Sequence, residues 1–294
     1  MERDAGRISR RRFLGALGLG VAAAGAGATV LETRRVTVTR HVLGAAEPAS
    51  GVPPLRIVQL ADLHLGELDG HAERVAEVVT ELRPRVVVFT GDSVDRLDTA
   101  GVLEGFLRLL PPVDAAFATL GNWEHLSPEQ PEELRRAYGR HGVRLLVNES
   151  AALEHGGRRV LVTGVDDLRG SPSIHGALRG VDPAANHLLL AHSPAYRDAL
   201  VGMGAGPRPV GPRWEEPLER FRVTAMLAGH THGGQVAPFG FAPVRPRGSG
   251  RYVAGWYRDA RPHLYVSRGI GTSIVPVRLG APPEIAVFDW HLAG

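Results

Sequence analysis

Seven side chains that can bind metal ions follow a series of short apolar runs in this sequence. Each run is rich in β-branched or aliphatic residues and ends in a small residue, Gly or Ala, directly before the polar position. Because the carboxyl ends of parallel strands line one crevice, we expect these side chains to meet there. The seven residues are Asp62, His64, Asp92, Asn122, His192, His230 and His232.

The types and spacing of these residues suit a centre that holds two divalent ions. In Asp62-Leu63-His64 and His230-Thr231-His232 the first and third residues of an extended segment point the same way, so each pair could hold one ion or bridge two. Two ions about 3.5–4 Å apart are a known solution for phosphoryl transfer. Taken singly, each residue could equally be a turn former at the end of a strand, so the prediction depends on the whole set.

The composition excludes several other classes of protein. The chain has no cysteine, so a thiolate site is impossible, and ligation by His, Asn and carboxylates fits Mn, Fe or Zn without selecting among them. It also has no lysine, which excludes Schiff-base lysines and the P-loop lysine of nucleotide kinases and ATPases. The formal charge of +3 is concentrated in residues 1–28, and the remainder is formally neutral, so no nucleic-acid partner is expected.

The first 28 residues have the pattern of an export signal. Arg10 and Arg11 lie in Ser-Arg-Arg-Arg-Phe-Leu, and an uncharged run rich in Gly and Ala follows from Phe13 to Val30. This pattern resembles a twin-arginine signal, which makes the twin-arginine export machinery an expected partner. At about 18 residues the run is marginal for crossing a bilayer, so the alternative is a retained anchor that associates with the membrane. We expect the protein in the periplasm, in the cell wall or on the outer face of the cytoplasmic membrane.

The rest of the chain is expected to form an α/β sandwich. Residues 29–54 are interpreted as an N-terminal strand and linker, and residues 55–294 as the main domain. Helical spacing of apolar residues predicts helices at Ala72–Leu82, Val102–Leu110 and Glu132–His141. Segments 201–217 and 238–250, rich in Gly and Pro, are expected as loops at the rim of the site. The predicted strands are Arg56–Leu60, Arg85–Thr90, Ala115–Leu120, Arg159–Thr163, His187–Ala191, Val223–Ala228, Leu264–Ser267 and Ile285–Asp289.

The motifs, in this order, resemble those of the calcineurin-like metallophosphoesterase superfamily over about residues 56 to 285. The pieces are Asp62-Leu63-His64, Gly91-Asp92, Gly121-Asn122, His192 and Gly229-His230-Thr231-His232. Segments 229–235 and 264–273 resemble one branch of it, the exported bacterial envelope phosphodiesterases. The resemblance implies two mixed β-sheets flanked by helices and hydrolysis of a phosphomonoester or phosphodiester by metal-activated water.

The resemblance also implies how the ligands are divided between two metal ions. Asp62, His64 and His232 would hold the first ion. Asn122, His192 and His230 would hold the second, and Asp92 would bridge the two. From the expected envelope location, the expected substrate is a phosphate ester there: a lipid-linked, nucleotide or wall-linked phosphate.

The third motif departs from the usual family pattern. In most members the Asn is followed by a His that contacts the phosphate, but here Trp123 takes that place and the nearest imidazole is His125. Either His125 enters the site as the catalytic acid, or the reaction proceeds without a protein acid. We predict the first, because a general acid contributes about 10²–10⁴-fold to the rate.

Other polar residues are left without a direct ligand role. Asp95, Asp166 and Asp167 fit turns or helix caps as well as hydrogen bonds to the ligands. The alternative function is a non-catalytic metal-binding or phosphate-binding envelope protein in which Trp123 marks lost activity. A serine hydrolase is a weaker interpretation, because Ser193 lacks the Gly-x-Ser-x-Gly turn.

Overall fold

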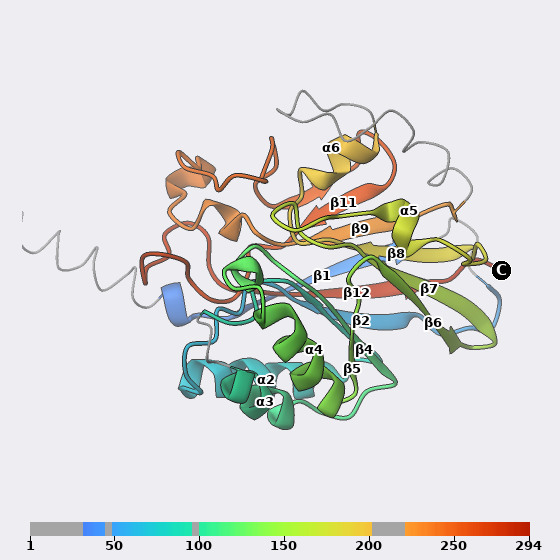
Figure 1. Cartoon of the computed structure of the whole chain (residues 1–294), viewed down its shortest axis with the longest axis horizontal. Helices are drawn as coiled ribbons and strands as arrows, with labels where there is room; N and C mark the ends of the chain where they lie inside the picture. The colour runs from blue at the N-terminus through green and yellow to red at the C-terminus, as the bar shows by residue number, and fades with distance from the viewer. Residues whose placement is uncertain (1–31, 45–48, 96–99, 202–220) are drawn as a thin grey trace, which may run out of the picture.

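The short β-branched runs of the sequence form two six-stranded sheets that pack face to face, with helices on both outer faces (Figure 1). The structure is a computed structural model that describes residues 32–44, 49–95, 100–201 and 221–294. The predicted sandwich of two mixed sheets flanked by helices is therefore confirmed. The predicted export signal at 1–28 lies outside the described residues, as does nearly all of the predicted loop at 201–217.

The first sheet has a parallel centre, and four of the candidate ligands follow its strands. Strands β2 to β5 are parallel, while β12 runs antiparallel to β2 and parallel to the edge strand β1. The order across the sheet is β1 (Thr37–Gly44), β12 (Glu284–His291), β2 (Leu55–Leu60), β3 (Val86–Thr90), β4 (Ala115–Thr119) and β5 (Val143–Leu145).

The second sheet delivers the remaining ligands from its own parallel centre. Strands β7, β8, β9 and β11 are parallel, and the edge strands β6 and β10 are antiparallel to their neighbours. The order is β10 (Gly255–Tyr257), β11 (His263–Val266), β9 (Ala225–Ala228), β8 (Asn186–Leu190), β7 (Arg158–Gly164) and β6 (Glu149–His155).

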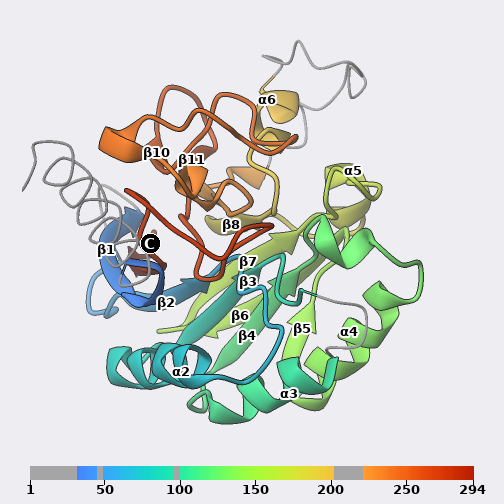
Figure 2. The ribbon, with the colours of Figure 1, turned by 90° about the vertical axis from the view of Figure 1, so that its left-hand side faces the viewer.

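Local sequence signals determine where the first long helix begins and ends. The Asp69 carboxylate accepts hydrogen bonds from the backbone at the start of α2 (Gly70–Leu82), and Arg83, in a left-handed conformation before Pro84, ends it. Helices α3 (Ala100–Leu109) and α4 (Gln130–Arg140) lie beside α2 on the outer face of the first sheet (Figure 2). The short helices α5 (Ile174–Ala177) and α6 (Tyr196–Leu200) cover the second sheet.

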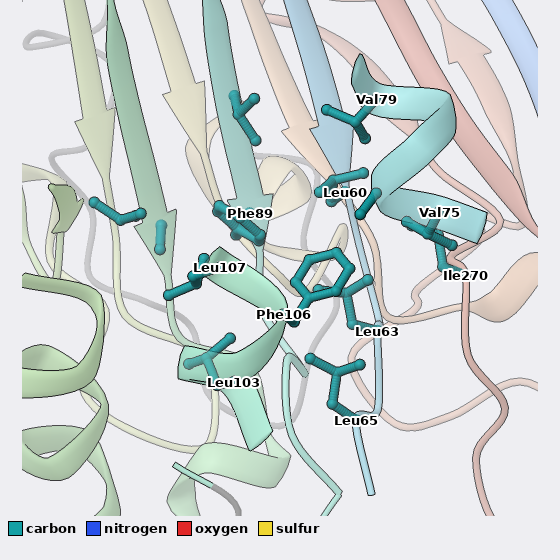
Figure 3. Packing of buried hydrophobic residues seen from close by; sticks show 14 of the residues in the cluster. Leu60, Leu63, Leu65, Val75, Val79, Phe89, Leu103, Phe106, Leu107 and Ile270 are labelled. Atoms are coloured by element: carbon teal, nitrogen blue, oxygen red, sulfur yellow. The ribbon is translucent and has the colours of Figure 1, made fainter. Parts of the chain in front are cut away.

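Three apolar layers hold these elements together, one between the sheets and one under each set of helices. Figure 3 shows the layer under α2 and α3, where Phe106 packs among Leu60, Phe89 and residues of the site loops. Leu63 belongs to this layer although its two neighbours are candidate ligands. Burial of Leu63 therefore fixes the loop that carries Asp62 and His64.

All eight predicted strands and all three predicted helices are present, with ends that shift by up to a few residues. The sequence pattern did not predict β5, β6, β10, α5 and α6. These elements are short or lie at the edges, where periodicity has too few residues to be read. Within the described part of the chain, no helix is both long and apolar enough to cross a membrane.

Candidate metal centre

The candidate ligands lie just past the carboxyl ends of five strands, at one end of the sandwich. Figure 2 views the molecule from this end. Asp62, Asp92 and Asn122 follow β2, β3 and β4 of the first sheet, whereas His192 follows β8 and His230 follows β9 of the second. The sheets are joined here, because the Gln59 side-chain amide donates to the Ala228 carbonyl and His192 bonds the Thr90 carbonyl. The centre thus spans both sheets.

Five of the seven residues have a left-handed backbone conformation. Their φ values lie between +46° and +73°, a region that non-glycine residues rarely adopt and that costs about 1–2 kcal/mol per residue. The chain must turn sharply at each strand end, and neighbouring glycines allow loops to approach, as where Gly121 lies against Asp92 and leaves no room for a Cβ. The five are Asp62, His64, Asp92, His230 and His232.

Six of the seven residues form two groups whose ligand atoms lie within 4.8 Å of one another. Asp62, His64 and His232 form one group, and Asp92, His192 and His230 form the other, all of them buried. Asn122 adjoins the second group, since its Oδ1 is 3.2 Å from His192 Nε2. The structure thus brings all seven predicted ligands to one place.

The Asp92 carboxylate lies between the two groups. Its Oδ2 is 3.6 Å from His64 Nε2 in the first group and 3.3 Å from His192 Nε2 in the second. Its Oδ1 accepts a hydrogen bond from the Trp123 backbone at 2.9 Å, which fixes the plane of the carboxylate. Asp92 is therefore placed to contribute a carboxylate oxygen to both groups.

The distances between imidazole nitrogens are those expected of two ligands of one metal ion. His64 Nε2 lies 3.1 Å from His232 Nε2, and His192 Nε2 lies 3.0 Å from His230 Nδ1. Two nitrogens at metal–ligand distances of about 2.0–2.1 Å in tetrahedral or octahedral arrangements lie about 3.0–3.4 Å apart. The donor set of imidazole, carboxylate and amide groups suits Mn, Fe or Zn.

Three of the four imidazoles have one nitrogen bonded to an acceptor, which leaves the other nitrogen facing the centre. His192 Nδ1 donates to the Thr90 carbonyl at 2.9 Å, and His64 Nδ1 lies 3.3 Å from Asp95 Oδ1. His230 Nε2 donates to the Arg247 carbonyl at 2.6 Å. Such bonds fix the tautomer that a metal ligand needs. Asp95, left undecided by the sequence, thus contacts a candidate ligand directly.

The fourth imidazole faces a buried arginine that sequence analysis missed. The Arg278 guanidinium lies 3.2 Å from His232 Nδ1 and also donates to the carbonyls of Gly271, Arg268 and Ala281. Burial, followed by the charges of His64 and Arg278, holds the pKa of His232 well below its usual value. Burial, more than either charge, therefore favours neutral His232, and the hydrogen bonds of Arg278 tie together the loops around it.

A buried glutamate joins the loops that carry Asp92 and Asn122. The Glu124 carboxylate accepts backbone hydrogen bonds from Asp92 at 3.0 Å, from Ser93 at 2.6 Å and from Gly121 at 2.7 Å. Burial, with the nearby charge of Asp92, raises the pKa of Glu124 to about 7. No role for Glu124 was expected from the sequence, because its three partners are backbone N–H groups and two of them lie in another loop.

The electrostatics of the centre follow from the carboxylates that it buries. Burial raises the pKa of Asp62 to about 6 despite the opposing charge of His192. Burial works against a charged His192, but the charge of Asp92 and a hydrogen bond to it raise the pKa of His192 well above its usual value. Cations are therefore favoured in this centre.

Trp123 and His125 lie on one short helical turn, η1 (Trp123–His125), directly after Asn122. The Trp123 ring stands edge-on to His64 with ring centroids 5.1 Å apart. His125 Nε2 lies 2.6 Å from Asp166 Oδ1, and Asp166 also accepts backbone hydrogen bonds from Asp167 and Ser171. In a 3₁₀ turn residues three apart lie on the same face, which places His125 on the face of Asn122.

Comparison with known proteins agrees with this geometry. The model of the calcineurin-like phosphoesterase family matches residues 55–234, which include all seven candidate ligands. The chain belongs to the calcineurin-like phosphoesterase family. It is 32% identical to the metallophosphoesterase YkuE of Bacillus subtilis, covering 96% of this chain and 97% of YkuE. It is 27% identical to the phosphodiesterase YaeI of Escherichia coli, covering 96% of this chain and 99% of YaeI.

The chain is thus a metal-dependent phosphoesterase of the calcineurin-like family, and the superfamily prediction is confirmed. Families of this kind use divalent metals, and the two buried groups are where this chain could hold them.

Asp95→Ala is expected to weaken metal binding by about 10–100-fold, because the carboxylate that orients His64 is lost. Titration of the metal-free protein with Mn²⁺ or Zn²⁺ measures the dissociation constant. Asp114→Ala is the matched control, since Asp114 pairs with Arg85 at the opposite end of β4. Equal affinities in the two variants would show that Asp95 does not support the centre.

Proposed function

We propose that this phosphoesterase holds two divalent ions at once and hydrolyses phosphate esters in the cell envelope. The position of Asp92 carries the two-ion proposal, because one oxygen of its carboxylate lies within 3.6 Å of an imidazole nitrogen in each group. Two ions held side by side acidify water and neutralise the oxygens of a phosphoryl group during in-line displacement.

The protein's own residues supply the fixed surroundings for that reaction. Backbone hydrogen bonds to Glu124 hold the Asp92 loop and the Asn122 loop in one arrangement. Asp62 accepts the His230 backbone N–H at 2.8 Å, which couples the two sheets at the centre. Ligands fixed in this way need little reorganisation as charge develops on the phosphoryl group.

We expect Asp92→Asn to reduce kcat/KM by at least about 10²-fold, because the variant lacks the charge that serves both groups. The assay uses bis(p-nitrophenyl) phosphate and p-nitrophenyl phosphate with the Mn²⁺-loaded protein, and metal content per chain is measured in parallel. Asp114→Asn is the control at a distant, exposed carboxylate.

Three results decide between the proposal and its alternatives. Wild-type protein with two ions per chain and turnover supports the two-ion phosphoesterase. One ion per chain with turnover would contradict the two-ion proposal alone. Metal binding without turnover for Mn²⁺, Fe²⁺ and Zn²⁺ would favour a non-catalytic metal-binding protein.

His125 is proposed as the acid that protonates the leaving group, with Asp166 as its partner. The hydrogen bond that His125 donates to Asp166 raises the pKa of His125, although burial opposes the shift. A raised pKa keeps the imidazole protonated to higher pH, so the proton is available near neutrality. The rate that depends on this proton falls as pH rises through the raised pKa.

His125→Ala should slow hydrolysis of an ester with a poor leaving group by about 10²–10⁴-fold and hydrolysis of a dinitrophenyl ester far less. Asp166→Asn should move the alkaline limb of the pH–rate profile to lower pH, because the pKa of His125 would fall. His141→Ala, at the end of α4, is the control. Rates near wild type with both esters would show that the reaction proceeds without His125.

The envelope location is proposed from the arginine pair and the uncharged run in residues 1–30. A protein outside the cytoplasm would meet lipid-linked or wall-linked phosphate esters, and these are the proposed substrates. Export through the twin-arginine route carries folded protein, so metal ions could be loaded before export.

Replacement of Arg10 and Arg11 by Lys is expected to retain the full-length protein in the cytoplasm of a host with the twin-arginine route. Cell fractionation followed by immunoblotting measures the distribution. Arg7→Lys, outside the motif, is the control and should be exported like the wild type. Export of the double variant at the wild-type level would contradict this route.

A further inference from the structure

Two loops at the metal-centre end of the molecule expose large apolar side chains to solvent. The first loop follows the ligand His232, contains the short turn η3 (Pro238–Gly240) and exposes Phe239, Phe241 and Val244. The second loop, residues 272–279, exposes Ile274 and Val275. The exposed fractions of Phe239 and Ile274 are 106% and 93%, so neither side chain is covered by the described part of the chain. We call these five residues the apolar tip.

Hydrogen bonds join the two loops into one unit. The Gln235 side-chain amide donates to the carbonyls of Ser273 and Val275, and its Oε1 accepts from the Ser273 backbone. The Ala237 backbone N–H donates to the Leu279 carbonyl at 2.7 Å. Phe239 and Ile274 both have a left-handed backbone, which is unfavourable for a β-branched residue such as Ile274. The five side chains of the apolar tip therefore belong to one hydrogen-bonded unit and are not isolated exposed residues.

Arginines lie within the loops of the apolar tip and beside them. Segments 235–250 and 268–283 contain no acidic residue, and Arg245 and Arg247 of the first loop are exposed. Arg34 and Arg35 are also exposed, one and two residues after Thr33, whose hydroxyl accepts a hydrogen bond from the Arg278 backbone at 2.8 Å. Exposed apolar groups flanked by arginines match the interface of a bilayer with anionic headgroups.

The path of the chain points to the same partner. The uncharged run from Phe13 to Val30 joins the described structure at residue 32, next to the bond between Thr33 and the second loop. The loops and the start of β1 lie at one end of the molecule, on the left of Figure 1. If the run from Phe13 to Val30 is held at a membrane, the end of the molecule that carries the two loops is held close to the same membrane.

We propose that the apolar tip docks on the surface of an anionic lipid bilayer and inserts Phe239 and Ile274 among the headgroups. The docking is separate from any anchoring by the N-terminal run. It does not depend on the reaction proposed above, because the apolar tip contains none of the candidate ligands and not His125. It places the metal centre toward the lipid, since the backbone carbonyl of Arg247 in the first loop accepts a hydrogen bond from His230 Nε2.

Because the chain has no cysteine, a single introduced cysteine can be labelled specifically. Single substitutions Phe239→Cys and Ile274→Cys in the full-length protein each carry an environment-sensitive fluorophore such as NBD. Val42→Cys on β1 and Leu109→Cys on α3 are matched controls, because both are exposed apolar positions near the opposite end of the sandwich. Wild-type metal content in each labelled protein checks that the fold is retained.

Vesicles of phosphatidylcholine with phosphatidylglycerol are expected to shift the emission of labels at 239 and 274 to the blue. Quenchers attached to the lipid chains should then reduce that emission, while labels at 42 and 109 stay unchanged. This pattern distinguishes docking from anchoring alone, which would hold the protein at the vesicle without burying the labels at 239 and 274. Pure phosphatidylcholine vesicles should give a weaker response, because they lack the attraction for arginine.

A second measurement removes the apolar groups. The double variant Phe239→Ser, Ile274→Ser should reduce the lipid-quenched fraction of a label at 241 by at least about 10-fold at limiting lipid. Its hydrolysis of a soluble ester should equal that of the wild type. Labels at 239 and 274 that do not respond to vesicles would overturn the proposal. So would a response that depends on protein concentration alone, which would assign the apolar tip to a second copy of the chain.

Discussion

The burial of three carboxylates at the junction of two sheets is the constraint on which the rest of this structure depends. Asp62, Asp92 and Glu124 are each at most 2% exposed, and ionised carboxylates are costly to remove from water unless they are paired. Glu124 is stabilised by three backbone N–H groups, and Asp62 and Asp92 by surrounding imidazoles. A centre with this charge distribution is stable only with cations, either protons on His64 and His192 or metal ions in their place.

That constraint explains the strained backbone at the strand ends. Five of the seven candidate ligands have a left-handed backbone where the chain leaves a strand at the junction of the sheets. The left-handed turns at Asp62 and Asp92 redirect the chain at that point, and their unfavourable conformation is offset by neighbouring packing. Leu63 and Leu65 alternate with Asp62 and His64, so the same four residues contribute two side chains to the core and two to the centre.

Much of this arrangement could be predicted from the sequence, because its signals are local. A run such as Arg85–Thr90 followed by Gly91 and Asp92 predicts a strand, a turn and a ligand within eight residues. The supporting residues could not be predicted in this way. Glu124 acts on backbone groups some 30 positions earlier, and Arg278 acts on a histidine 46 positions earlier. No pattern within one segment identifies partners that only the folded chain brings together, and strands of three residues such as β5 and β10 are too short to show a period.

Arg278 connects the metal centre to the surface beside it. Its guanidinium contacts His232, and its backbone N–H donates to the Thr33 hydroxyl. Arg278 itself belongs to the loop, residues 272–279, that exposes Ile274. A displacement of that loop would be transmitted to His232 through the buried Arg278 side chain, which several hydrogen bonds hold in place. Because close-packed interiors deform little, the backbone position of this loop and the geometry of the centre are linked. The exposed loop and the candidate ligand His232 are thus joined through one buried side chain.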